Sequence, residues 1–432
     1  MNGTLRRGTV ALSATVALLL ASACGSDSGG SDGGAGWWHI QTGEQALSDL
    51  FPQLAEEFNE ANDANIQPEP IANDDFKPAL TTAMQAGDPP DIFHSWGGGV
   101  LAQYVRADLV RDITDEVSDV VKNMSPGALA PYTIDGRIYG LPFDMGMVGM
   151  WYNKALFEEA GLDPDNPPAT WSEFLDAVTT LKEAGITPIA LAGSAPWTQH
   201  YWFSYLAIRV MGVDGYTAAR EAKSFDDPGF LRAAELWKEL VDMEPFQSGF
   251  LQQGYGGEDS SPAVFGAGGA AMHLMGQWDP SVQESSSGTS LGDDLGWFPF
   301  PAVEGGKGSI NEVYGGGNGH AVGANAPDYA VDFLVFLATE AYDRILEQEP
   351  SIIPVTLDAE IPASEVNRIL IKETVANASA FQLYFDQDLP PAVGDQVNAS
   401  VAAITDGSLT PEEAVQQMHD TFQAEPDFAV EK

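Results

Sequence analysis

Near the start of the chain, apolar residues recur at helical spacing, with short apolar runs before and after them. From Leu47 to Phe58 they fall three or four positions apart, which predicts an amphipathic helix with Pro52 in its first turn. The segments 37–40 and 91–96 are mostly apolar and short, which predicts buried strands. A strand, a helix and a second strand are therefore expected in this part of the chain.

The same alternation continues toward the C-terminus, with clear helix boundaries. Thr170 and Glu173 form a capping box in front of a helix that Gly185 is placed to end, and 186–191 is the next strand-like run. Further helices are predicted to begin at Pro228, Pro327 and the segment 410–413. Strands that alternate with helices predict an α/β protein with mainly parallel sheets.

Residues 1–23 have the layout of an export signal: a cationic start with Arg6 and Arg7, an apolar run, and small residues at the end. The small residues lead directly to Cys24, the single cysteine of the chain. This arrangement resembles a bacterial lipobox, except that Ala21 replaces the usual leucine. We expect lipid attachment at Cys24; an ordinary cleaved signal that happens to contain a cysteine is the alternative. Residues 24–36 are predicted to form a flexible tether.

Size and charge limit the possible functions of the remaining chain. Cleavage before Cys24 would leave 409 of the 432 residues, more than one core usually serves, so two lobes or domains are expected. The formal net charge of -44 repels phosphates, which argues against nucleic acid and anionic lipid as partners. Adaptation to high salt and an ordinary acidic surface both explain this charge.

The sequence contains no recognisable catalytic or metal-binding motif. The six histidines are scattered, and no cysteine follows Cys24 that could form a thiolate zinc site. The segment 305–309 resembles a phosphate loop only superficially, because Pro301 stands where the first glycine should be. The 63 acidic residues leave a glycosidase carboxylate pair open without supporting one. We expect no enzyme activity, no cofactor and no metal.

Three tryptophans lie beside glycine, amide or carboxylate residues, a combination that suits a sugar. Trp96 precedes three glycines, Trp197 lies two positions before Gln199, and Trp278 follows Gln277. An aromatic ring covers the C–H face of a sugar while amides and carboxylates bind its hydroxyls. Packing in the core is the alternative for each tryptophan taken alone. Their coincidence with glycine-rich breaks favours a cleft.

Several segments together resemble extracellular solute-binding proteins of family 1, the maltose-binding-like receptors of carbohydrate ABC importers. The resemblance covers nearly the whole chain after the tether. Its carriers are Gly87–Ile92, Gly140–Pro142, Trp151–Phe157, Gly161–Pro164, Thr170–Phe174, Phe265, Gly268, Ala270–Met272, Gly276 and Trp278.

The resemblance implies a periplasmic-binding-protein-like fold, with two α/β lobes, a ligand cleft and hinge crossings. The chain would cross between lobes near 142–145, 309–313 and 351–355. The expected division is lobe 1 from 37–143 and 311–350, and lobe 2 from 144–310 and 351–432. Closure of the lobes around the ligand would then be what the importer recognises.

Mapped onto this sequence, the resemblance places ligand contacts in both lobes. The expected contacts are Gln41, Thr42, Glu44, Trp96, Gly97, Asp144, Trp197, Gln199, Gln277, Trp278, Gly317 and Asn318. Asp144 is equally well explained as a structural carboxylate beside the hinge. Gly317 lies in a glycine-rich run that would bring the backbone and Asn318 close to the sugar.

The resemblance implies a lipoprotein that delivers a neutral mono- or oligosaccharide to membrane permease subunits. We expect a monomer anchored through Cys24 on the extracellular face of a Gram-positive, actinobacterial cell membrane. An exported glycoside hydrolase is one alternative, since it also needs a cleft, aromatic residues and carboxylates. A receptor of the same fold for a polyol or another polar solute is the other.

Overall fold

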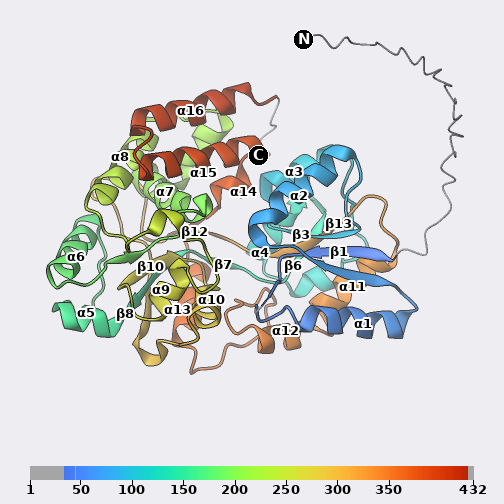
Figure 1. Ribbon diagram of the computed structural model, residues 1–432. Helices are drawn as coiled ribbons and strands as arrows, with labels where there is room; N and C mark the ends of the chain where they lie inside the picture. The colour runs from blue at the N-terminus through green and yellow to red at the C-terminus, as the bar shows by residue number, and fades with distance from the viewer. Residues whose placement is uncertain (1–33, 44, 427–432) are drawn as a thin grey trace, which may run out of the picture. The chain divides into compact units, whose positions relative to one another are not determined.

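The computed structural model describes residues 34–43 and 45–426, which form two lobes with separate sheets and cores (Figure 1). The expected signal segment 1–23, Cys24, most of the tether and the predicted ligand contact Glu44 lie outside these residues. Within them, no helix combines the length and the apolarity that crossing a membrane requires.

Lobe 1 is built on a five-stranded sheet with the strand order β2-β1-β3-β13-β6. Its strands are β1 (Ala35–His39), β2 (Ile66–Pro70), β3 (Ile92–Ser95), β6 (Gly140–Pro142) and β13 (Gly319–Val322). A two-stranded ribbon of β4 (Thr133–Ile134) and β5 (Arg137–Ile138) accompanies it. Side chains of β1 alternate between buried and half-buried, as expected for a strand with a covered face.

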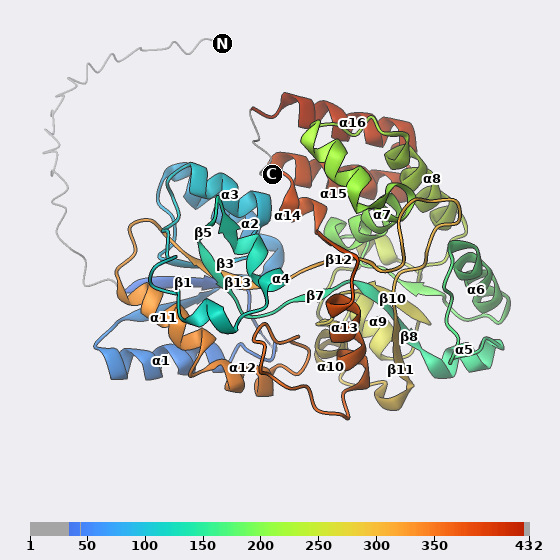
Figure 2. The same ribbon diagram turned by 180° about the vertical axis from the view of Figure 1, so that it is seen from behind.

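Helices cover both faces of this sheet (Figures 1 and 2). One face carries α1 (Leu50–Asn62), α11 (Tyr329–Ala338) and α12 (Tyr342–Gln348). The other face carries α2 (Asn73–Ala86) and α3 (Gly98–Arg106). Shorter helices, η1 (Val120–Asn123), α4 (Pro126–Leu129) and η2 (Ala130–Tyr132), lead back to the sheet. The sheet therefore separates two apolar clusters.

Lobe 2 contains two smaller sheets around one continuous core. The strand order β11-β8-β10-β9 comprises β8 (Gly149–Asn153), β9 (Ile189–Ala190), β10 (Met272–Met275) and β11 (Leu295–Phe298). The order β14-β12-β7 comprises β7 (Gly146–Met147), β12 (Glu312–Gly316) and β14 (Ala380–Leu383). The lobe's helices are α5 (Lys154–Ala160), α6 (Trp171–Glu183), α7 (Pro196–Glu221), α8 (Pro228–Asp242), η3 (Phe250–Gln252), α9 (Ser261–Gly266), α10 (Asp279–Ser287), η4 (Gly292–Asp294), α13 (Val366–Ala376), α14 (Phe385–Asp388), α15 (Pro391–Thr405) and α16 (Pro411–Ala424).

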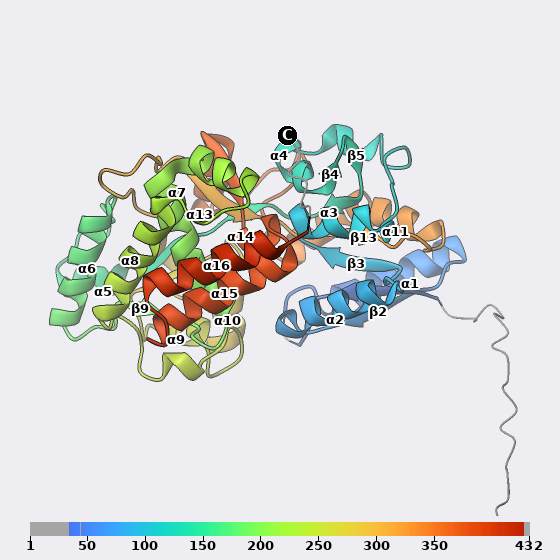
Figure 3. The ribbon, with the colours of Figure 1, turned by 90° about the horizontal axis from the view of Figure 1, so that it is seen from above.

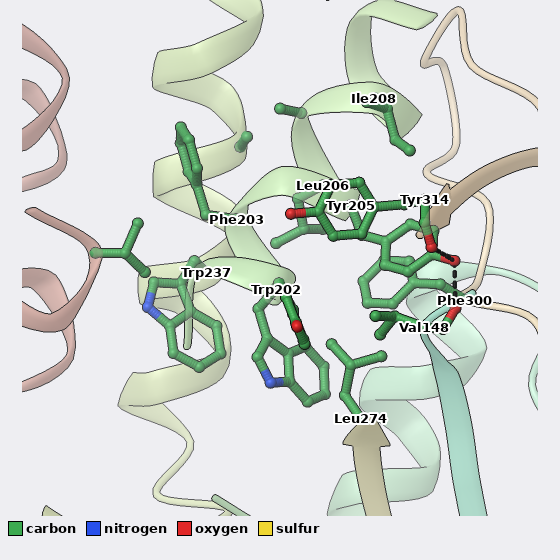
Figure 4. Close-up of a cluster of buried hydrophobic side chains, with 14 of the residues drawn as sticks. Val148, Trp202, Phe203, Tyr205, Leu206, Ile208, Trp237, Leu274, Phe300 and Tyr314 are labelled. Carbon is green, nitrogen blue, oxygen red and sulfur yellow. Dashed lines mark hydrogen bonds between the residues drawn. The ribbon is translucent and has the colours of Figure 1, made fainter. Parts of the chain in front are cut away.

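Helix α7 runs through the centre of this core (Figure 4). The Tyr205 ring stacks on Phe300 with centroids 4.6 Å apart, and Trp202 stacks on Trp237 at 5.6 Å. The Tyr205 hydroxyl donates to the Val148 carbonyl oxygen, which ties α7 to the segment entering β8. Buried aromatic pairs of this kind contribute beyond their area alone, so α7 is a rigid support for the side chains near its N-terminus.

Local signals predicted most helix boundaries correctly. The Thr170 and Glu173 capping box is present at α6, and Pro228 is the first residue of α8. The prediction for Pro327 was wrong, because α11 begins at Tyr329. The Pro327 carbonyl oxygen accepts from the Ala330 N–H, so the proline belongs to a turn that precedes the helix.

The prediction of mainly parallel sheets was also wrong. Strand β1 pairs in parallel with β2 and β3, but β13 pairs antiparallel with β3 and β6, and β8 pairs antiparallel with β10 and β11. Strands β8 and β13 follow a crossing, so each enters its sheet from the other lobe. They therefore run opposite to the strands built by local strand–helix–strand units.

The chain crosses between the sheets at three places. The first crossing, 143–145, lies between β6 and β7. The segment 351–355, expected as the third, bridges to the first through Met145 and Ile353, and the chain stays bonded to lobe 1 as far as Leu357, whose N–H donates to the Asn123 carbonyl oxygen. The second lies at Gly317 and Asn318, because β12 pairs within lobe 2 and β13 within lobe 1. This is several residues beyond the expected 309–313, since the chain completes β12 before it leaves lobe 2.

Candidate functional site

The Asp144 carboxylate joins all three crossings. Its Oδ2 accepts from Gln277 Nε2 at 2.7 Å and from Asn318 Nδ2 at 2.9 Å. Its Oδ1 accepts from the Ile353 backbone N–H at 3.1 Å. The Asn318 carbonyl oxygen in turn accepts from the Asp144 N–H at 3.2 Å. One side chain on the first crossing is therefore bonded to the second, to the third and to lobe 2.

Burial controls the electrostatics of this carboxylate. Asp144 is only 3% exposed, and burial raises its pKa to about 7, with the Glu349 carboxylate acting in the same direction. The hydrogen bonds from Asn318, Ile353 and Gln277 oppose this shift and favour the ionised form. Burial and hydrogen bonding therefore act on this pKa in opposite directions.

Small residues allow the crossings to pack this tightly. A Cβ on Gly317 would lie 2.2 Å from the Asp144 carbonyl oxygen. A Cβ on Gly146 would lie 2.0 Å from Gln277 Oε1. A larger residue at Gly317 would require the first crossing to move, and one at Gly146 would require the Gln277 side chain to move. The structure thus brings together four predicted site residues: Asp144, Gln277, Gly317 and Asn318.

A hollow opens beside these crossings and is lined from both lobes. Its lining residues are Gly127, Ala128, Pro131, Tyr132, Asp144, Met145, Gly316, Gly317 and Phe381. The Tyr132 hydroxyl donates to the Ser95 carbonyl oxygen at 2.7 Å, which fixes its ring beside β3. Phe381 of β14 is 38% exposed, so part of its ring faces solvent.

Trp96 and Gly97 lie at the end of β3 in lobe 1. The Trp96 ring meets His94 edge-on, with centroids 4.5 Å apart, and stays partly exposed. Gly97 has φ +72°, and a Cβ there would lie 2.6 Å from Pro131, which lines the hollow. The parallel pairing of β1 with β3 brings Gln41 and Thr42, which follow β1, to the same edge of the sheet.

Lobe 2 provides an aromatic wall formed by Trp197, Tyr201, Tyr255 and Tyr384. Trp197 packs edge-on against Tyr255 at 4.9 Å and Tyr201 at 5.5 Å, and Tyr201 stacks on Tyr384 at 5.1 Å. Tyr384 also covers Gly316, where a Cβ would lie 2.5 Å from its ring. The wall therefore extends from α7 to the second crossing.

The predicted ligand contacts Trp278 and Gln199 differ in exposure. Trp278 is partly exposed at the start of α10 and lies over Gly276, where a Cβ would be 2.1 Å from its ring. Gln199 is fully buried, and its Nε2 donates to the Gly193 carbonyl oxygen at 2.9 Å. The structure does not bring Gln199 together with Asp144.

Sequence reasoning missed several residues of this region: Tyr132, Tyr201, Tyr255, Phe381 and Tyr384. A usable signal existed for Tyr384, because it follows β14 and precedes Asp386, the aromatic-and-carboxylate pattern that singled out Trp278. In the described part of the chain, no group of three histidine, cysteine, aspartate or glutamate side chains is placed to hold a metal ion.

Comparison with known proteins identifies relatives over most of this architecture. A family model described as bacterial extracellular solute-binding protein matches residues 44–344. An uncharacterised ABC transporter extracellular-binding protein of Pyrococcus horikoshii is 27% identical over 273 residues, which is 62% of this chain and 59% of that relative. The match thus spans less than two thirds of that relative's length.

Two solved structures match at higher coverage. One comes from work on xylan utilization by the thermophilic bacterium Caldanaerobius polysaccharolyticus. It is 30% identical with a TM-score of 0.81, and the match covers 89% of this chain and 99% of that protein's chain. The other, a chitin oligosaccharide binding protein, is 27% identical with a TM-score of 0.81 and covers 90% and 98%. These matches confirm the predicted two-lobed fold.

Proposed function

The chain belongs to the bacterial extracellular solute-binding protein family, and on that premise we propose that it captures a neutral mono- or oligosaccharide for an ABC importer. Ligand would bind between the lobes, and their closure would be read by the permease subunits. A lipid at Cys24 would hold the receptor beside that importer. No bond would be broken, since the site would only recognise and release its ligand.

One observation carries this proposal: aromatic faces lie beside buried polar atoms that have no protein partner. Trp197 Nε1 and Gln277 Oε1 are among the buried side-chain atoms of the described residues that have no hydrogen-bond partner; others, such as Trp37 Nε1 and Ser204 Oγ, lie in the cores of the lobes. Orphaned polar atoms are rare and call for a partner. Sugar hydroxyls would supply partners, while Trp96, Trp197 and Trp278 would cover the apolar face of the ring.

The charged groups between the lobes favour a neutral ligand over an anionic one. Asp144 and Asp386 are both buried there, and Lys77, the nearby cation, is already paired with Asp386. A phosphate or uronate would have to displace Asp386 from Lys77 and would leave a buried carboxylate unpaired, which is costly.

We also propose a lobe boundary at Gly317–Asn318 instead of near residue 310.

A thermal-shift screen of the full-length protein tests the proposal. The panel would contain xylo-oligosaccharides, chito-oligosaccharides, common mono- and disaccharides, polyols, and a sugar phosphate as the anionic control. A ligand near one hundred times its Kd stabilises the native state by about 2.7 kcal/mol, which raises Tm by several degrees. Stabilisation by a polyol alone would reassign the ligand class. No response to any neutral compound would overturn the proposal.

One arrangement in lobe 2 could suggest an enzyme instead. Ser261 Oγ lies 3.1 Å from His273 Nε2, and His273 Nδ1 lies 2.7 Å from Asp279 Oδ2, which is the order of contacts in a Ser-His-Asp triad. Ser261 and Asp279 are 0% exposed and His273 is 1% exposed, so no substrate reaches the hydroxyl. We assign the three residues to the packing of α9 and α10. Incubation with nitrophenyl glycosides and a nitrophenyl ester would reveal turnover if this assignment is wrong.

A further inference from the structure

An ion pair connects the two lobes where α14 lies beside α3 (Figures 1 and 3). Lys77 Nζ of α2 donates to Asp386 Oδ2 of α14 at 2.7 Å, although the two residues are 309 positions apart. The Asp386 side chain is 5% exposed, and that of Lys77 is 37% exposed. The carboxylate is thus nearly buried, while the Lys77 side chain that pairs with it is partly exposed to solvent.

Lobe 2 fixes the position of Asp386 firmly. Two residues later, Asp388 accepts from the Tyr216 hydroxyl at 2.8 Å and from the Arg220 guanidinium, both on α7. His200 Nε2 lies 3.8 Å from Asp386 Oδ1, but burial lowers the pKa of His200 to about 4, so it is neutral at pH 7. Lys77 therefore supplies the positive charge that Asp386 needs.

The backbones beside the ion pair are in direct contact. A Cβ on Gly98, the first residue of α3, would lie 2.3 Å from Leu383 Cδ2 and 2.9 Å from the Gln387 carbonyl oxygen. The lobes thus meet at van der Waals distance next to Lys77, and little room remains for water between them. An ion pair in such a place is screened less than one on an open surface.

Lys77 also contacts the aromatic residue that we expect to cover the sugar. Its Nζ lies 5.2 Å from the centroid of the Trp96 ring, within the range of a cation–π interaction. A ligand that covers Trp96 would therefore lie beside the same amine that reaches across to lobe 2. The contact between the lobes and a ligand on Trp96 would thus share the Lys77 side chain.

We propose that Lys77 and Asp386 form a lock that holds the lobes in the arrangement seen here, which we infer from the direct contact at Gly98 to be the closed one, whichever solute the receptor binds. Removing the Lys77 charge would leave a nearly buried carboxylate without its cation, which penalises the closed arrangement alone. Loss of a charge-assisted hydrogen bond of this kind corresponds to a change of about tenfold or more in the ratio of closed to open molecules. Salt would weaken the lock because Lys77 is partly exposed.

The lock can be tested without knowing the ligand. Full-length protein with Cys24→Ser would carry spin labels at Glu60→Cys in lobe 1 and Gln416→Cys in lobe 2, both exposed positions. Pulsed electron paramagnetic resonance would then give the distribution of distances between lobes. We expect Lys77→Gln to move about tenfold more molecules into a longer-distance population. Asp386→Asn should act similarly, and the double variant should add little.

Lys122→Gln is the matched control, because Lys122 pairs with Asp119 on the exposed surface of lobe 1 and contacts no residue of lobe 2 in a described ion pair. This control should leave the distances unchanged. Identical distributions for the wild type and Lys77→Gln, at low and at molar salt, would overturn the lock. An equal shift in Lys122→Gln would do so as well. Neither result bears on whether sugars bind, so failure of the lock is distinguishable from failure of the proposed function.

Discussion

Replacing His94 by glutamine should make lobe 1 less sensitive to acid. His94 of β3 is in register with His320 of β13, and His39 ends the adjacent strand β1. All three are at most 3% exposed, and the Nε2 of each has no hydrogen-bond partner among the described groups. Burial lowers the pKa of His94 to about 3 and that of His39 to about 4, and it lowers the pKa of His320 well below its usual value.

The sign and size of the effect follow from these values. In the unfolded chain the His94 pKa is 6.5, so below that pH the unfolded state binds a proton that the native state rejects. The contribution of neutral His94 to stability is therefore present above pH 6.5 and is lost as the pH falls toward about 3. At about 1.36 kcal/mol per pH unit, the full span corresponds to about 4–5 kcal/mol. That is a large part of a typical free energy of unfolding.

Urea unfolding measured at a series of pH values provides the assay. Between about pH 6 and about pH 4, the unfolding free energy of the wild type should fall more steeply than that of His94→Gln, by up to about 1.36 kcal/mol per pH unit. Comparing the two proteins cancels the effect of the large negative charge, which both carry. Equal slopes for His94→Gln and the wild type would refute the reasoning.

Four further predictions concern other parts of the chain. Arg209→Lys should lower the free energy of unfolding by about 3 kcal/mol or more in urea titrations, because the buried guanidinium serves five backbone carbonyls that one ammonium cannot all reach. Gly317→Ala should cost about 1–3 kcal/mol in the same assay, since its Cβ would meet the first crossing. Trp278→Ala should weaken binding of the sugar found in the screen at least about tenfold with little change in Tm, whereas a collapse of the fold would return Trp278 to a packing role. Cys24→Ser should release the protein from the membrane fraction, and a wild-type protein with a free thiol would contradict lipid attachment.

Local chemistry made the helix boundaries predictable. Thr170 and Glu173 satisfy each other's backbone donors within four residues, so the cap is fully encoded in the segment. The same holds at α16, where Thr410 and Glu413 form a second capping box. The polar setting of Trp96 and Trp278 was visible for the same reason, because the neighbouring glycines and amides are adjacent in sequence. The family relationship inferred from such segments is confirmed by the family match.

Contacts between distant segments could not be predicted in this way. The direction of β13 depends on where the chain leaves lobe 2, and no residue near β13 encodes that by itself. Lys77 and Asp386 carry no shared motif, and only the folded chain brings them within 2.7 Å. The aromatic wall likewise joins Trp197 to Tyr384 through Tyr201, across elements that the sequence separates widely. Sequence identifies candidate side chains, whereas topology decides which of them meet.

Asp144 shows how local sequence signals and contacts between distant segments combine. The sequence left it between a ligand contact and a structural carboxylate, and its geometry favours the structural role. Its oxygens already accept from Gln277, Asn318 and the Ile353 N–H, which leaves little acceptor capacity for a sugar hydroxyl. Each of those donors comes from a different crossing or from lobe 2, so any rotation of the lobes must change at least one bond. We therefore infer that Asp144 sets the geometry of the hinge, and that ligand contacts fall mainly to the aromatic side chains and to Gln277.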